Sequence, residues 1–87
     1  MIHRKQDWIS AKVGDEIVMM SVSNGRYLGL NSVGACIWEM LETPMTMEEI
    51  KERLLEQFNV SAAICDVEVT AFIEKLAEQE AITIDPQ

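Results

Sequence analysis

Two short turn motifs, ten residues apart, divide the first third of the chain into extended segments. Gly14-Asp15 places glycine at the first central position of a type II′ turn, and Asn24-Gly25 is the pair that a type I′ turn favours. Both turn types join antiparallel strands through two-residue loops. The sequence therefore predicts a three-stranded antiparallel meander, with strands at about 8–13, 16–22 and 26–30.

The register that two-residue loops impose sorts the strand residues into two faces, because side chains alternate along a strand. One predicted face carries Ile9, Ala11, Val13, Val18, Met20, Val22, Tyr27 and Gly29. The other carries Trp8, Ser10, Lys12, Ile17, Met19, Ser21, Leu28 and Leu30. Both faces hold large apolar groups, so the pattern leaves open which of them packs against the rest of the fold.

After Asn31 the apolar spacing changes from two residues to three and four, which is typical of helices. Asn31 or Ser32 can cap a first helix, Thr46 with Glu49 forms a capping box at a second, and Ser61 can cap a third. These signals predict helices over about 32–42, 47–57 and 62–80, followed by a short strand at 82–84. Residues 1–7 are polar and are expected to be frayed, with His3 solvated.

Strands followed by helices indicate an α+β fold, here a winged helix-turn-helix-like arrangement of a three-stranded antiparallel sheet and three helices. With 87 residues and 48% hydrophobic side chains, the chain is expected to form one domain over 1–87, with its core within about 8–84. No stretch of about 18 uncharged apolar residues and no signal peptide is present, so we expect no membrane partner and a cytoplasmic location.

Fifteen acidic and seven basic residues give a formal charge of −8, which repels phosphate backbones. Nucleic acid is therefore not an expected partner. Catalytic groups are also scarce: His3 is the single histidine, and Cys36 and Cys65 match neither a redox pair nor a zinc spacing. We interpret both cysteines as reduced core residues, and we expect no enzyme activity, no cofactor and no metal site.

The remaining feature is a surface for a partner. The third strand lies at the edge of the meander, and hairpin pairing predicts that Tyr27 and Gly29 point their main-chain groups outward. The helix over 62–80 carries two apolar stripes, one with Val69, Phe72, Ile73 and Leu76 and a neighbouring one with Ile64, Val67 and Ala71. Either both stripes are core, or a groove between strand and helix accepts an added peptide strand.

A longer motif resembles a known family. The run from Tyr27 to Leu41 is similar to the Y-x-x-L-N-x-x-G-x-x-I-W-x-x-L signature of PqqD-like proteins, the recognition elements for precursors of ribosomally synthesised peptides. Asp66-Val67, Phe72-Ile73 and Leu76 resemble the pattern of that family's last helix. A free-standing chain of this length is most similar to the B1 proteins of lasso peptide clusters.

The resemblance implies that the leader region of a precursor peptide pairs with the third strand and packs on the last helix. It implies non-catalytic presentation of that leader to a B2-type leader peptidase, and to the cyclase, in lasso peptide maturation. The site residues that it implies are Arg26, Tyr27, Leu28, Gly29 and Leu30 on the strand and Asp66, Val69, Phe72, Ile73 and Leu76 on the helix. A basic leader residue is expected beside Asp66 or Glu74.

Two alternatives remain open. One is a PqqD-type chaperone that serves a radical SAM enzyme. The other, less favoured, is a winged-helix DNA-binding protein, whose recognition helix would need more basic residues than Lys51 and Arg53 among four glutamates in 47–57. One departure from the family also stands out: Glu80-Ala81 follows the last helix where relatives often have glycine, so the conformation there is left open.

Overall fold

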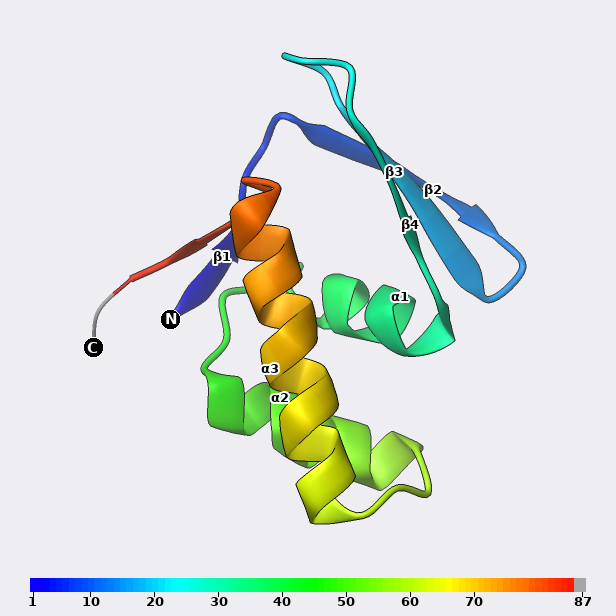
Figure 1. Cartoon of the computed structure of the whole chain (residues 1–87), viewed down its shortest axis with the longest axis vertical. Coiled ribbons are helices and arrows are strands. Elements are labelled where there is room, and N and C mark those ends of the chain that lie inside the picture. Colours follow the sequence, from blue (N-terminus) through cyan, green and yellow to red (C-terminus); the bar gives the residue numbers. More distant parts are fainter. Residues whose placement is uncertain (86–87) are drawn as a thin grey trace.

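The computed structural model describes residues 1–85, and Pro86 and Gln87 lie outside the described part. Figure 1 shows the helices beneath an antiparallel sheet, with a second small sheet at one side. This confirms the predicted α+β fold. In chain order the elements are β1 (Ile2–Arg4), β2 (Trp8–Val13), β3 (Glu16–Ser21), β4 (Tyr27–Leu30), α1 (Ser32–Met40), α2 (Met47–Gln57), α3 (Ala62–Glu78) and β5 (Ile82–Ile84).

The first residues are ordered as a strand, so the prediction of a frayed start is wrong. β1 pairs antiparallel with β5, with Ile2 opposite Ile84. The Ile2 N–H also donates to the Met45 carbonyl at 2.7 Å, and the Ile2 side chain is buried. His3 is half-buried, with its Nε2 2.6 Å from an Asp85 carboxylate oxygen. One apolar anchor and a main-chain partner far away in sequence outweigh the polar composition of this segment.

The first hairpin forms as predicted, whereas the second has a longer loop. Val13 pairs with Glu16 around Gly14, whose φ is 66°, as a two-residue turn requires. In the second hairpin the Ser21 N–H donates to the Arg26 carbonyl at 2.8 Å, so the loop comprises four residues, 22–25. The prediction of a two-residue loop is therefore wrong, and Met20 lies opposite Tyr27.

Asp7 explains the longer loop. Its carboxylate accepts hydrogen bonds from the Ser21 and Ser23 hydroxyls, and its carbonyl accepts one from the Val22 N–H at 2.7 Å. These contacts hold the loop residues toward the start of β2 and away from β4. The register moves by two residues, which preserves the alternation of side chains, so the predicted division into two faces still holds.

The structure resolves which face of the sheet is buried. Trp8, Ile17, Met19, Leu28 and Leu30 are buried, whereas most apolar residues of the opposite face are exposed. The buried face packs on a core that is formed mainly by the helices, including Ile37, Trp38, Leu41, Ile50, Leu54, Val69, Ile73 and Leu76.

The helix starts follow the predicted caps. Asn31, Thr46 and Ser61 each accept a hydrogen bond from a main-chain N–H three residues on, and Glu49 completes the capping box. α2 has the predicted bounds, and α1 and α3 each end two residues earlier than predicted. α3 ends in a Schellman motif, in which Glu80 has a φ of 59° and the Ala81 N–H donates to the Leu76 carbonyl at 2.9 Å.

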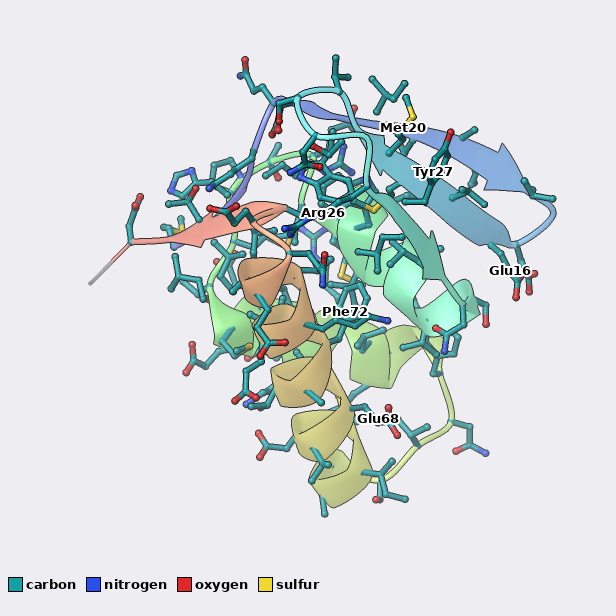
Figure 2. All side chains as sticks on the ribbon, turned by 45° about the horizontal axis from the view of Figure 1, so that its top comes forward. Glu16, Met20, Arg26, Tyr27, Glu68 and Phe72 are labelled. Carbon is teal, nitrogen blue, oxygen red and sulfur yellow. The ribbon has the colours of Figure 1, made fainter. Side chains whose placement is uncertain are left out.

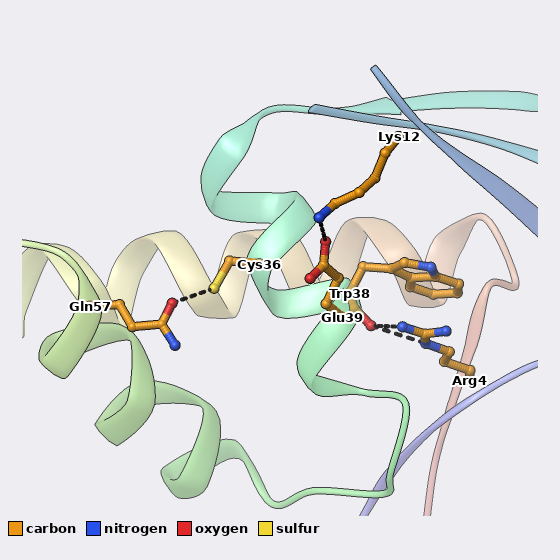
Figure 3. Close-up of polar contacts among 6 residues, drawn as sticks. All are labelled: Arg4, Lys12, Cys36, Trp38, Glu39 and Gln57. Atoms are coloured by element: carbon orange, nitrogen blue, oxygen red, sulfur yellow. Dashed lines mark hydrogen bonds and ion pairs between the residues drawn. The ribbon is translucent and has the colours of Figure 1, made fainter. Parts of the chain in front are cut away.

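Polar contacts hold α1 against β1 and β2 (Figure 3). The Arg4 guanidinium lies 4.4 Å from the Trp38 ring centroid, donates to the Trp38 carbonyl, and has a pKa lowered by burial. Lys12 forms an ion pair with Glu39 at 2.9 Å. Cys65 is buried, while Cys36 is partly exposed and donates to the Gln57 side-chain oxygen; both are free thiols. Burial raises the pKa of the Cys36 thiol.

Within residues 1–85, no helix is long and apolar enough to cross a membrane. The same part of the chain holds no group of three or more metal-ligating side chains of the His, Cys, Asp and Glu types.

Candidate peptide-binding groove

β4 is an edge strand with free main-chain groups. The strand order is β2-β3-β4, and hydrogen-bonded pairs alternate along an antiparallel ladder. Since Arg26 bonds to Ser21 on β3, Leu28 and Leu30 also direct their main-chain groups toward β3. Tyr27 and Gly29 therefore direct theirs outward, as the sequence predicts, even though the loop differs. These two residues offer an added strand two donors and two acceptors.

α3 forms the other wall, and its core stripe fixes which residues face the groove. Cys65, Val69, Ile73 and Leu76 are buried. At 100° per residue, Glu68, Phe72 and Gln79 lie at one border of that stripe, and Asp66 lies at the other. Figure 2 shows Phe72 on α3 between Arg26 above it and Glu68 below it.

An apolar pocket of about 330 Å³ opens between α3 and the start of α1. Phe72 reaches across to α1, where a Cβ on Gly34 would lie 2.8 Å from the Phe72 ring. Glycine at position 34 thus leaves room for the aromatic wall. The pocket is lined by Asn31, Val33, Gly34, Ile37, Leu54, Phe58, Val60, Ile64, Glu68 and Phe72. Its volume and lining suit one or two apolar side chains.

The predicted site residues fall into three groups. Tyr27 and Gly29 lie on the free edge of β4, Phe72 lines the apolar pocket, and Arg26 directly precedes β4. Asp66 faces away from the groove, because it forms an ion pair with Lys51 of α2. The remaining residues are buried beneath the groove and can support its walls but not touch a ligand from the surface: Leu28, Leu30, Val69, Ile73 and Leu76.

The second apolar stripe of α3 is not core. Ile64 and Val67 are 55% and 68% exposed, and Ala71 is exposed as well. Ile64 belongs to the pocket, whereas Val67 lies outside it. The prediction omitted Gly34, Phe58, Val60 and Glu68. A helical projection of 62–78 with Val69, Ile73 and Leu76 as core would have placed Glu68 at the groove. Phe58 and Val60, in contrast, reach the pocket through tertiary packing of the segment between α2 and α3, which no local pattern reveals.

The opposite edge of the sheet, β2, is less suited to strand addition. Its neighbouring cavity of about 440 Å³ is polar and contains Arg4, Ser10 and Glu42 in its wall. Lys12 of β2 points inward and pairs with Glu39 below the edge. Inward charges on an edge strand oppose pairing with another chain. The edge of β4, with an apolar pocket beside it, is therefore the more favourable place for a peptide.

Comparisons with known proteins identify the family. The model of the family described as coenzyme PQQ synthesis protein D (PqqD) matches residues 16–82. The chain belongs to the PqqD family. This family member is similar to a structure of TbiB1 in complex with the TbiA(beta) leader peptide, at 27% identity and a TM-score of 0.86, covering 98% of this chain and 99% of that one.

A structure of lasso peptide synthetase B1 complexed with the leader peptide shares the fold at 17% identity and a TM-score of 0.82, covering 95% of this chain and 98% of that one. No curated protein sequence gives a significant match to this PqqD family member.

Proposed function

We propose that this protein is a non-catalytic recognition element that binds the leader region of a precursor peptide in lasso peptide biosynthesis. The leader adds a strand to β4 and places apolar side chains in the pocket beside Phe72. The observation that carries this proposal is the edge of β4, where Tyr27 and Gly29 have outward main-chain groups, together with an apolar pocket that begins at Asn31, directly after the strand. The similarity to TbiB1, whose structure contains a leader peptide, supports it.

The partners that receive the leader are proposed to be a B2-type leader peptidase and then the cyclase. The support for a protein partner is an uncovered apolar surface, here called the outer sheet face: Ile9, Ala11, Val13, Val18, Met20 and Tyr27. Four of these, Ile9, Val13, Val18 and Tyr27, are 44–73% exposed. Neighbouring exposed apolar residues on one face are typical of an interaction site.

Tyr27 joins the two surfaces. Its main chain borders the groove, while its side chain lies on the outer sheet face, as Figure 2 shows together with Met20. A protein docked on that face would therefore lie next to a leader bound at β4. This continuity favours the peptidase, which must act on the bound leader, over a second copy of the chain with the same −8 charge.

The test of leader binding is a titration of the leader and core segments, as separate peptides, of the precursor encoded beside this gene. We expect the leader to bind and to shift the Tyr27 and Gly29 amide resonances, and the core segment to bind at least tenfold more weakly. Replacing the leader aliphatic residue that fills the pocket with alanine should weaken binding about 10- to 150-fold, since about 1.5–3 kcal/mol of apolar burial is lost. Equal affinity for both segments would refute leader recognition.

The test of peptidase docking uses Val18→Lys on the outer sheet face. Leader affinity should be unchanged, while the rate of leader cleavage by the neighbouring peptidase should fall. Val67→Lys is the matched control, because Val67 is equally apolar and more exposed but lies on α3. If the peptidase cleaves the leader at the parent rate in the presence of Val18→Lys, the outer sheet face is not the docking surface. If stimulation of a radical SAM enzyme is found instead, the PqqD-type chaperone is the better description.

A further inference from the structure

The two ends of the groove carry opposite charge. Resting on the function proposed above, we propose that the groove selects leaders by charge order: a basic side chain toward the N-terminal end of the strand that pairs with β4, and an acidic one toward its C-terminal end. The residues that read this order are Glu68 at one end and Arg26 with Lys75 at the other. On α3, Phe72 lies between Lys75 and Glu68, and the apolar pocket is lined by Phe72 and Glu68 and extends past Glu68 to Ile64.

Arg26 and Lys75 form the positive end. Arg26 directly precedes β4. Because it pairs with Ser21, its side chain lies on the face of the sheet that is directed toward the helices. Lys75 lies one turn beyond Phe72 and one turn before Gln79, on the same side of α3. Both are exposed, and neither has an ion-pair partner within residues 1–85.

No carboxylate within residues 1–85 forms an ion pair with this end, although Glu78 lies one turn beyond Lys75 on α3. Asp7 accepts hydrogen bonds from Ser21 and Ser23, and together with Glu80 it lines a separate cavity that includes neither Arg26 nor Lys75. The α3 carbonyls of Leu76 and Ala77 are occupied by the Schellman bonds, which reduces the negative charge that the helix end exposes.

Glu68 forms the negative end. It lines the apolar pocket, is exposed, and has no ion-pair partner in the described part of the chain. Asp66 and Glu74, which the sequence suggested for this role, lie elsewhere: Asp66 is paired with Lys51, and Glu74 projects from the side of α3 that faces away from the core. A carboxylate beside an apolar pocket favours a ligand with a basic side chain next to its apolar anchor.

The direction of the ligand follows from the direction of β4. Antiparallel pairing is the commoner arrangement, and it requires the added strand to run from the Leu30 end of β4 toward Arg26. The N-terminal end of the added strand therefore lies near Glu68 and its C-terminal end near Arg26. At about 3.4 Å per residue, the four steps from Arg26 to Leu30 place the two ligand charges roughly four to five residues apart.

The experiment is selection from a display library of random peptides, each about nine residues long so that it can span β4. The bait is the full chain, either unchanged or carrying Glu68→Lys. Glu74→Lys is the matched control, because it makes the same change of charge on an exposed face of the same helix. Binding at the groove is verified for each enriched peptide by the amide shifts of Tyr27 and Gly29.

We expect peptides enriched on the unchanged chain and on Glu74→Lys to carry Lys or Arg before the apolar anchor and Asp or Glu after it. On Glu68→Lys, the residue before the apolar anchor should change from Lys or Arg to Asp or Glu. For one selected peptide, reversal of each charge should weaken binding about two- to fivefold, an effect lost in 1 M salt. Groove-bound peptides without charge order would overturn this inference and leave the proposed function standing. Enriched peptides that leave Tyr27 and Gly29 unshifted would overturn both.

Discussion

The ring of Phe72 stands 2.8 Å from the point where a Cβ on Gly34 would lie, so α1 and α3 approach each other through the one residue type that has no side chain. The next atoms that such a Cβ would meet are another Phe72 ring atom at 3.2 Å and the Leu30 Cβ at 3.4 Å. Position 34 therefore controls where the aromatic wall of the groove can stand.

Gly34→Ala should weaken peptide binding more than it changes stability. The added methyl group displaces the half-buried Phe72 ring into the pocket, and we expect a 5- to 30-fold loss of affinity, about 1–2 kcal/mol of apolar contact. Alanine gains up to about 1 kcal/mol of helix propensity over glycine, which offsets the strain on the fold. Leader titration and thermal melting measure the two effects. Unchanged affinity would show that the ring can move without closing the pocket.

Gly29→Pro should abolish strand addition without unfolding the protein. Gly29 does not have a positive φ, and its main-chain N–H points away from β3. Proline removes that outward donor, which is tolerated on an edge strand. Leu28→Pro, by contrast, removes an inward hydrogen bond at a buried residue and should destabilise the whole fold. The measurements are circular dichroism melting and leader titration on both variants.

Gly29→Ala is the matched control for Gly34→Ala and for Gly29→Pro. A Cβ at position 29 meets no atom within 4 Å, and the N–H is retained, so folding and binding should both match the parent. A well-folded Gly29→Pro variant that binds leader as tightly as Gly29→Ala would refute docking at β4.

Glu80→Gly should stabilise the protein. Glu80 occupies the left-handed region with a φ of 59°, where a residue other than glycine costs about 1–2 kcal/mol. The hydrogen bond from Trp8 Nε1 ends on the Glu80 carbonyl and is therefore kept. Glycine also has greater backbone freedom in the unfolded chain, which offsets part of this effect. We therefore expect the free energy of unfolding to rise by about 0.5–1 kcal/mol and Tm by a few degrees. Glu80→Gln, which removes the charge alone, should show no such gain.

Asp7 should make stability depend on acid pH. Hydrogen bonds from Ser23, foremost, and Ser21 lower the pKa of the Asp7 carboxyl. A lowered folded-state pKa contributes stability that is present above the unfolded value of about 3.9 and is lost as the pH falls through the folded value. The difference in Tm between the parent and Asp7→Asn should therefore shrink below about pH 4. Asp15→Asn, at an exposed turn, is the control, and a difference that is constant with pH would contradict this role.

Local signals predicted most of the fold. The helix starts at Asn31, Thr46 and Ser61 were readable because each cap acts within three residues of its own position. The first hairpin was readable for the same reason. The outward groups of Tyr27 and Gly29 were predicted correctly despite the wrong loop length, since a shift of two residues preserves both the hydrogen-bonding alternation and the side-chain faces.

The remaining features depend on residues that are distant in sequence. The loop before β4 is four residues long because Asp7 binds it, and β1 forms because β5 and Met45 provide main-chain partners. The groove shows the same limit. The spacing of apolar residues on α3 identifies two stripes. Val69 is buried and Ile64 is exposed because of how α2 and the sheet pack against the helix, which the spacing does not reveal.

The pairing of β1 with β5 has a practical consequence for protein engineering. Residues 1 and 85 lie side by side, since the Asp85 N–H donates to the Met1 carbonyl at 2.9 Å, and Figure 1 shows β1 and β5 on the side of the molecule away from β4. A short linker could therefore join the ends into a circle, with new termini opened at the exposed Gly14-Asp15 turn. Fluorescent proteins or surface tethers attached beside β1 or β5 would likewise leave the groove unobstructed.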